Sequence, residues 1–128
     1  MLTVRFESGI DLRRIYGVLG VKGEPFGSNF VMYDEDTPIA LWRMRITVEG
    51  EPIGLISDII FVDGVEEDDK TFFLHAMFFK LIEGAPIKLR IAGVKPEFEK
   101  FGFEEKDGNM EVFSKDINLH YMCGRKKA

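Results

Sequence analysis

The sequence predicts a single domain, over residues 1–128, with an α/β (α+β) fold. A mixed, mostly antiparallel central sheet of about six to seven strands is expected to carry one long and one or two short helices. Three observations predict it. Several short segments alternate apolar and polar residues with a period of two, as half-buried strands do. One long helical segment lies between two strand segments, and 128 residues suit one hydrophobic core better than two.

The first quarter of the chain predicts a strand, a short helix and a loop. Leu2 to Phe6 alternates with period two, which is typical of a strand. Apolar residues at helical spacing follow Asp11, and Gly17 and Gly20 are candidate stop signals. The glycine- and proline-containing stretch that continues to Asn29 predicts an irregular loop, and such loops often border a binding cleft.

An antiparallel meander is expected next. Strands are predicted from Phe30 to Tyr33, from Ile39 to Val48 and from Ile53 to Val62, with turns at 34–37 and 49–51. Both faces of the third strand are mostly apolar, so it is expected to be central and covered on both sides. Strict alternation along it places Ile56 and Asp58 on the same face.

The second half begins with the longest helix, predicted from Glu66 to Ile82 and ended by Gly84. Its surface is apolar nearly all the way round, so we expect it to be buried on more than one side. The remaining expected elements are a strand at Ile87–Ile91, one or two helical turns at Pro96–Phe101, a hairpin of Phe103–Glu105 with Met110–Phe113, and a further strand at Ile117–Cys123.

Charge and composition exclude several classes of protein. Lys and Arg number 17 against 22 Asp and Glu, so the net charge of −5 argues against nucleic acid as a partner. No apolar run is long enough to predict a membrane span, and we expect no membrane association. Cys123 is the single cysteine and cannot form an internal disulfide, which favours a cytoplasmic location. His120 and Cys123 point to opposite faces of the expected strand, so no metal site is predicted.

The order of these elements resembles that of the GNAT superfamily of acyl-CoA-dependent N-acetyltransferases. The most specific match is Phe98–Phe103, which is similar to the family's Tyr-Glu-Lys-Leu-Gly-Phe signature before its last hairpin. Residues 1–116 follow the family plan, and 117–128 form a tail outside it.

That resemblance implies an acyl-CoA cofactor and an amine acceptor. On the family pattern, Ile60 and Val62 would offer backbone N–H groups to the thioester, and Gly64 would lie in the turn that receives the CoA diphosphate. Asp58, in the fourth strand, would be the general base for the amine.

Three departures from the family pattern all affect the part of the site that would bind acyl-CoA. The segment Asp63 to Asp69 carries five carboxylates, whereas the family has glycines there whose bare N–H groups bind diphosphate. The tyrosine that often protonates the departing thiolate corresponds to Phe98, which has no proton to give. Pro96 shortens the helix that usually follows the fifth strand. We therefore expect a degenerate acyl-CoA site.

The candidate site residues also have structural interpretations. Asp58 is either a catalytic base or the partner of Arg43 in a cross-strand ion pair, and the ion pair is favoured. Arg43 and Arg45 share a strand face and are candidates for holding a ligand carboxylate or phosphate. The family places the acceptor cleft near the glycine-rich loop, which makes Glu24, Phe26 and Asn29 candidate ligand contacts.

Two functions follow. The first is a non-catalytic or weakly catalytic domain that forms a homodimer or binds another protein through the apolar excess of its long helix or through the C-terminal strand. The second is a divergent N-acyltransferase that uses acetyl-CoA and acts on an unidentified amine; only this alternative requires a cofactor. A small-molecule sensor that uses the loop with Arg43 or Arg45 is a third possibility.

Overall fold

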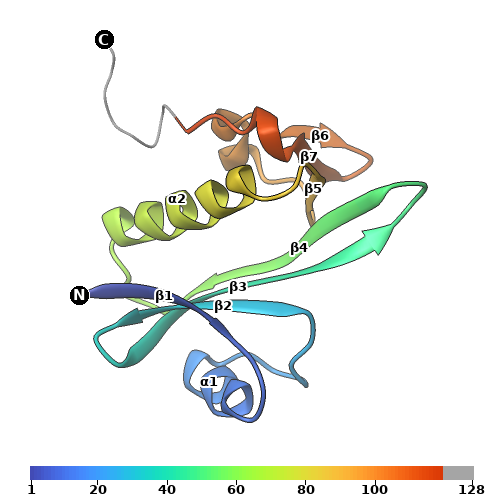
Figure 1. The fold of residues 1–128 in the computed structure, drawn as a ribbon. Helices are drawn as coiled ribbons and strands as arrows, with labels where there is room; N and C mark the ends of the chain where they lie inside the picture. Colours follow the sequence, from blue (N-terminus) through green and yellow to red (C-terminus); the bar gives the residue numbers. More distant parts are fainter. Residues whose placement is uncertain (120–128) are drawn as a thin grey trace.

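The computed structural model describes residues 1–119 and builds them around one seven-stranded sheet (Figure 1). The strand order is β1-β2-β3-β4-β5-β7-β6, and every neighbouring pair is antiparallel except β4 and β5. This confirms the predicted α/β class. The elements are β1 (Leu2–Glu7), α1 (Asp11–Leu19), β2 (Ser28–Asp34), β3 (Thr37–Val48), β4 (Pro52–Phe61), α2 (Glu67–Glu83), β5 (Lys88–Ile91), η1 (Pro96–Phe101), β6 (Glu104–Lys106), β7 (Asn109–Phe113) and η2 (Ser114–Asp116).

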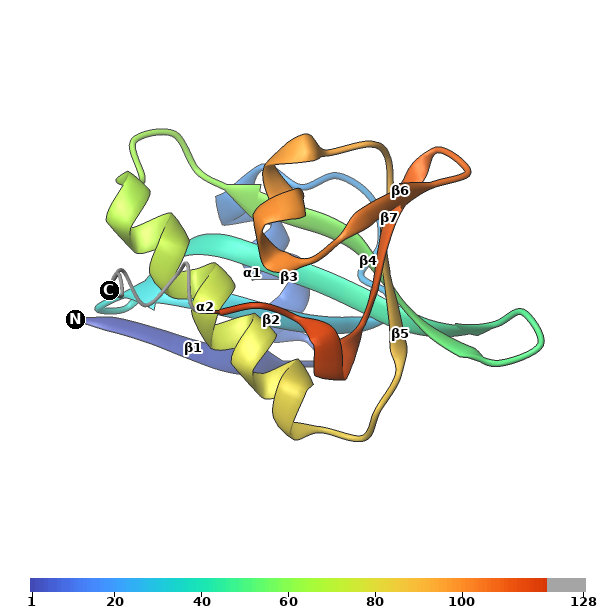
Figure 2. The same ribbon diagram turned by 90° about the horizontal axis from the view of Figure 1, so that it is seen from above.

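The two α-helices cover opposite faces of the sheet, α1 on one side and α2 on the other (Figures 1 and 2). The larger core lies on the α2 side, where Trp42 of β3 and Phe73 and Phe78 of α2 are fully buried. A smaller core joins α1 to β2 and β3 through Ile15 and Leu41. The strand predicted at Ile53–Val62 is central, and its second half contacts both cores, through Ile59 on the α2 side and Ile60 on the α1 side.

Both helices end where the sequence places glycines. Gly20 adopts the left-handed conformation (φ +75°) and donates its N–H to the last turn of α1, while Gly17 lies inside the helix. The N–H of Gly84 donates to the carbonyl of Lys80 at the end of α2. No helix within residues 1–119 has both the length and the apolar character needed to cross a membrane.

A β-bulge in β4 changes the predicted alternation of side chains. Arg43 pairs with Asp58, but Met44 pairs with Ile56, so Ser57 is an extra residue opposite β3. Its hydroxyl donates to the carbonyl of Arg43 at 3.2 Å. Ile56 consequently packs in the α2-side core while Asp58 faces the α1 side, and the prediction that these two residues share a face is wrong.

The C-terminal part closes the α2-side core. The predicted turns at Pro96–Phe101 form a 3₁₀ helix. The hairpin of β6 and β7 turns through Asp107 (φ +53°) and Gly108 (φ +84°), as a type I′ turn requires. Residues 117–119 are not in a strand, and the rest of the strand predicted to Cys123 lies outside the described residues.

Candidate functional site

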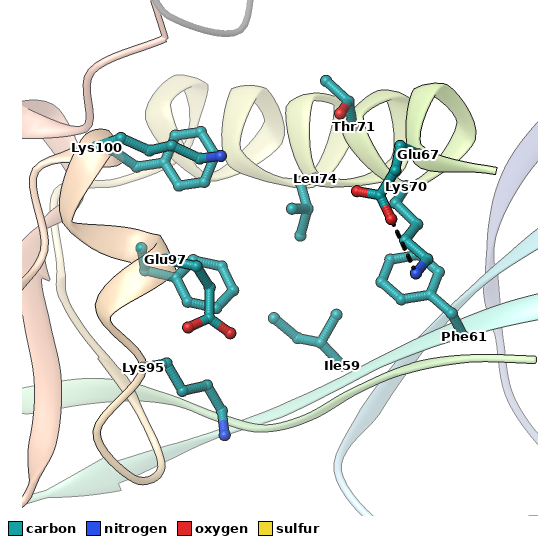
Figure 3. Close-up of a pocket in the computed structure, with 11 residues that line it drawn as sticks. Ile59, Phe61, Glu67, Lys70, Thr71, Leu74, Lys95, Glu97 and Lys100 are labelled. Atoms are coloured by element: carbon teal, nitrogen blue, oxygen red, sulfur yellow. Dashed lines mark ion pairs between the residues drawn. The ribbon is translucent and has the colours of Figure 1, made fainter. Parts of the chain in front are cut away.

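A cavity of about 430 Å³ lies between β4, the first turns of α2 and η1 (Figure 3). It exists because β5 pairs with β4 only at Ile53–Ile56 and then leaves towards η1, whereas β4 continues to Phe61. The edge of β4 beyond Ile56 is therefore open. The apolar side chains lining the cavity are Ile59, Phe61, Leu74, Phe98 and Phe101.

Charged side chains surround this apolar surface. The cavity is bordered by three lysines and two glutamates, a formal charge of +1. Lys70 forms an ion pair with Glu67 at 3.2 Å, and its ammonium lies 5.6 Å from the ring centroid of Phe61. Lys95 and Glu97 extend from the segment around η1 (Figure 3).

Backbone donors also face the cavity, but they are not the predicted ones. The N–H of Val62 donates to the carbonyl of Ile39 at 3.0 Å, and Ile60 faces β3 in the same ladder. Because backbone directions alternate along a strand, Ile59 and Phe61 direct their N–H groups to the open edge. Ile60 and Val62 instead contact the α1-side core, and Gly64 does not line the cavity.

The start of α2 bears four consecutive carboxylates, from Glu66 to Asp69. Glu66 is the N-cap residue in an extended conformation, and it makes no side-chain cap hydrogen bond. Its carbonyl accepts the N–H groups of Asp69 and Lys70, each at 3.0 Å. The N-cap and the first turn of α2, at the positive end of the helix dipole, therefore carry four carboxylates.

Phe98 is 6% exposed and lines the cavity. Its ring packs edge-on to Phe78, with centroids 6.3 Å apart, and lies 5.9 Å from the rings of Phe101 and Phe103. The side chain is thus an apolar wall with no group that donates a proton.

The predicted ion pair between Arg43 and Asp58 is present on the α1 face of the sheet. The Nε of Arg43 donates to Oδ2 of Asp58 at 2.7 Å, and Nη2 lies 2.5 Å from the same oxygen. Nη1 donates to the hydroxyl of Tyr16 at 3.0 Å. Tyr16 in turn donates to Oδ1 of Asn29 at 2.5 Å, so one polar chain links β4, β3, α1 and β2.

The glycine-rich loop covers this chain of hydrogen bonds. Asn29 donates to the carbonyls of Phe26 and Gly27, and the ring of Phe26 lies 4.1 Å from the guanidinium carbon of Arg43. Burial alone would lower the pKa of Arg43, but the hydrogen bonds with Tyr16 and Asp58 outweigh it and raise the pKa. Sequence reasoning missed Tyr16, because its spacing indicated only an apolar helix position.

A second cavity, of about 460 Å³, lies between this loop and the turn after β1. It brings together Glu24, Phe26 and Asn29, the three residues predicted near the acceptor cleft. Glu24 is paired with Arg13, whose Nη1 donates to it at 2.9 Å. Arg45 does not line this cavity; it is exposed and makes no ion pair within the described part of the chain.

Glu7 also lines the second cavity and accepts a hydrogen bond from the hydroxyl of Tyr33. Burial, together with this hydrogen bond to a carboxylate, raises the pKa of Tyr33 to about 12. Neither residue was singled out from the sequence. They lie 26 positions apart, so they form no local motif.

Across residues 1–119, no group of three or more His, Cys, Asp or Glu side chains could hold a metal ion. His120 and Cys123 lie outside that range.

Comparisons with known proteins show the fold. The GNAT N-acetyltransferase YhbS from Escherichia coli, in complex with CoA, is similar with a TM-score of 0.68 and 14% identity, over 94% of this chain and 91% of that chain. A chain of the KacTA–DNA complex has a TM-score of 0.66 and 8% identity, over 96% and 99%. A mutant AtaT toxin bound to the C-terminus of the antitoxin AtaR has a TM-score of 0.60 and 10% identity, over 94% of this chain and 97% of that chain.

No family model matches the sequence, and no curated protein does. The likeness is therefore one of fold, and the chain has the GNAT fold.

Proposed function

We propose that this protein, whose fold is that of the GNAT N-acetyltransferases, is a binding and self-association domain without ordinary CoA-dependent turnover. The observation that supports it is the run of carboxylates from Glu66 to Asp69 at the start of α2, of which Glu67 lines the cavity between β4, α2 and η1. A diphosphate at a helix N-terminus needs positive potential. Like charges about 4 Å apart repel by about 1 kcal/mol even in water, and by more at a protein surface.

The self-association surface is the outer face of α2. Phe72 and Phe79 are 44% and 48% exposed, and together with His75 and Ala76 they line a shallow apolar hollow. Large aromatic side chains gathered on one exposed face are typical of protein interfaces. The fold neighbours KacTA and AtaT occur in complexes with partner macromolecules, which also favours a protein partner here.

Calorimetric titration with acetyl-CoA tests whether the protein has lost the ability to bind this cofactor. We expect no binding up to about 1 mM ligand, a concentration that would detect an affinity of about −4 kcal/mol. A variant in which the four acids from Glu66 to Asp69 are changed to their amides removes the repulsion and is expected to gain measurable affinity. Micromolar binding by the natural protein would contradict the proposal.

Analytical ultracentrifugation tests the self-association. The natural protein is expected to sediment as a dimer, and the double variant Phe72→Lys/Phe79→Lys as a monomer, because two charges would enter an apolar contact. Phe113→Lys, at another phenylalanine that is 43% exposed, is the control and should leave the dimer intact. A natural protein that is monomeric at every concentration would refute this part.

The open edge of β4 supports a second candidate, a divergent N-acyltransferase. Acetyl-CoA would enter the cavity, where the N–H groups of Ile59 and Phe61 face the open edge and would polarise its thioester carbonyl. The amine would attack the carbonyl carbon and lose its proton to Asp58. The departing thiolate would take a proton from solvent, because Phe98 stands where the family's tyrosine would supply one. Against this candidate, Asp58 lies on the α1 face and is held by Arg43.

The variant Asp58→Asn tests this candidate. If acetyl transfer to an amine is found, the substitution should abolish it, because an amide accepts no proton at neutral pH. Unchanged turnover would remove Asp58 from the mechanism.

A further inference from the structure

Resting on the proposed loss of CoA turnover, we infer that the cavity between β4, α2 and η1 binds a small amphipathic carboxylate. The ligand would have an acyl chain or an aromatic ring that ends in a single carboxylate. Three properties of the cavity support this: its apolar surface, its three lysines against two glutamates, and the run of carboxylates that begins α2 at its border.

The apolar surface accommodates the body of the ligand. Ile59 and Phe61 of β4 lie opposite Leu74 of α2 (Figure 3), and Phe98 of η1 also lines the cavity. A volume of about 430 Å³ is near the lower end of what small-molecule sites have, which are about 300–1,000 Å³. Burying an alkyl chain there contributes about 0.8 kcal/mol for each methylene group.

The lysines attract the carboxylate of the ligand. The cavity has a formal charge of +1, although the whole chain has a net charge of −5. Lys70 is neutralised by Glu67, whereas Lys95 is exposed at the mouth and makes no ion pair among residues 1–119. The open-edge N–H groups of Ile59 and Phe61 add hydrogen-bond donors for a carboxylate oxygen.

The acidic end limits the size of the ligand. Glu67 lies at the border of the cavity and begins the first turn of α2, with Asp68 and Asp69 directly after it. A ligand that carried a diphosphate past this border would meet Asp68 and Asp69, while Lys70 is already paired with Glu67. A monocarboxylate beside Lys95 would stay away from that run and would share the cavity there with the single carboxylate of Glu97.

Calorimetric titrations with three ligands test the inference: decanoate, 1-decanol and decanoyl-CoA. We expect decanoate to bind about tenfold more tightly than 1-decanol, because the alcohol lacks the charge that Lys95 attracts. Decanoyl-CoA should bind no more tightly than decanoate. All three are kept below the concentrations at which they aggregate.

Two charge reversals of equal size locate the site. Lys95→Glu should weaken decanoate binding about tenfold and leave 1-decanol unchanged. Lys22→Glu changes an exposed lysine outside the cavity and should alter neither. Leu74→Trp fills the apolar surface and should weaken both ligands, with a circular dichroism melt to verify that the variant is folded.

Equal affinities for decanoate and 1-decanol, or equal effects of Lys95→Glu and Lys22→Glu, would overturn the inference. An absence of decanoate binding would also overturn the inference. If acetyl-CoA fails to bind as well, the proposed function remains valid without the inferred carboxylate site. Decanoyl-CoA binding about tenfold more tightly than decanoate would overturn the inference and the proposed function together.

Discussion

Replacing Phe78 with alanine is expected to destabilise the protein by about 4 kcal/mol, in the range of buried phenylalanine truncations. Phe78 is fully buried in α2. Its ring centroid lies 5.4 Å from Trp42, 5.1 Å from Phe101 and 5.7 Å from Phe103, so it joins the sheet, the helix and the C-terminal segment. The substitution leaves a cavity among rigid rings that cannot collapse into it. Urea unfolding followed by tryptophan fluorescence measures the loss.

An exposed phenylalanine outside the proposed dimer surface is the matched control for this prediction. Phe113 of β7 is 43% exposed, so Phe113→Ala removes the same atoms at little burial cost. It should change the free energy of unfolding by about 0.5 kcal/mol or less. Similar losses for the two variants would show that the aromatic cluster around Phe78 is not the centre of the core.

Replacing Arg43 with leucine is expected to cost about 3 kcal/mol, because it leaves the Asp58 carboxylate without its partner and removes the hydrogen bond that the Tyr16 hydroxyl accepts. This loss of stability is at the lower end of the range for broken buried ion pairs, since the Asp58 side chain is 29% exposed and water can reach it. The loss is read from urea unfolding at neutral pH.

Two further variants separate the ion pair from general effects of the substitution. Arg45→Leu alters an exposed arginine of the same strand and should change stability by about 0.5 kcal/mol or less. The double variant Arg43→Leu/Asp58→Leu should recover part of the loss, because it removes the uncompensated charge. Equal stabilities of Arg43→Leu and Arg45→Leu would refute the importance of the pair.

The candidate site could be predicted only in part. The Glu49–Gly50 turn allowed registers in which Arg43 and Asp58 share a face, opposite or diagonal to one another, and their ion pair is present. The register next to the turn, with Val48 opposite Pro52, would place Arg43 opposite Ser57, so the bulge at Ser57 is what brings Asp58 opposite Arg43. Tyr16 and Asn29 complete the same network from other elements. Their roles depend on how α1 and β2 pack against β3, and the spacing of residues in the sequence gives no information about that packing.

The backbone donors illustrate the opposite case. The resemblance to GNAT enzymes singled out Ile60 and Val62, whereas the ladder with β3 turns those N–H groups away from the cavity. A shift of one residue along a strand reverses both side-chain and backbone directions. The bulge at Ser57 makes such a shift, so the direction of each group follows from pairing rather than from alternation.

The sequence by itself determined the order and type of the elements from β1 to β7, the glycine ends of α1 and α2, and the acidic start of α2. These depend on interactions between residues a few positions apart. The tertiary structure alone decided the bulge in β4, the separation of β5 from β4, and the cavity where Ile59, Leu74 and Phe98 meet. Those features arise from packing between segments that are distant in the chain. A local sequence pattern does not show which of these distant segments will pack together, so it cannot predict them.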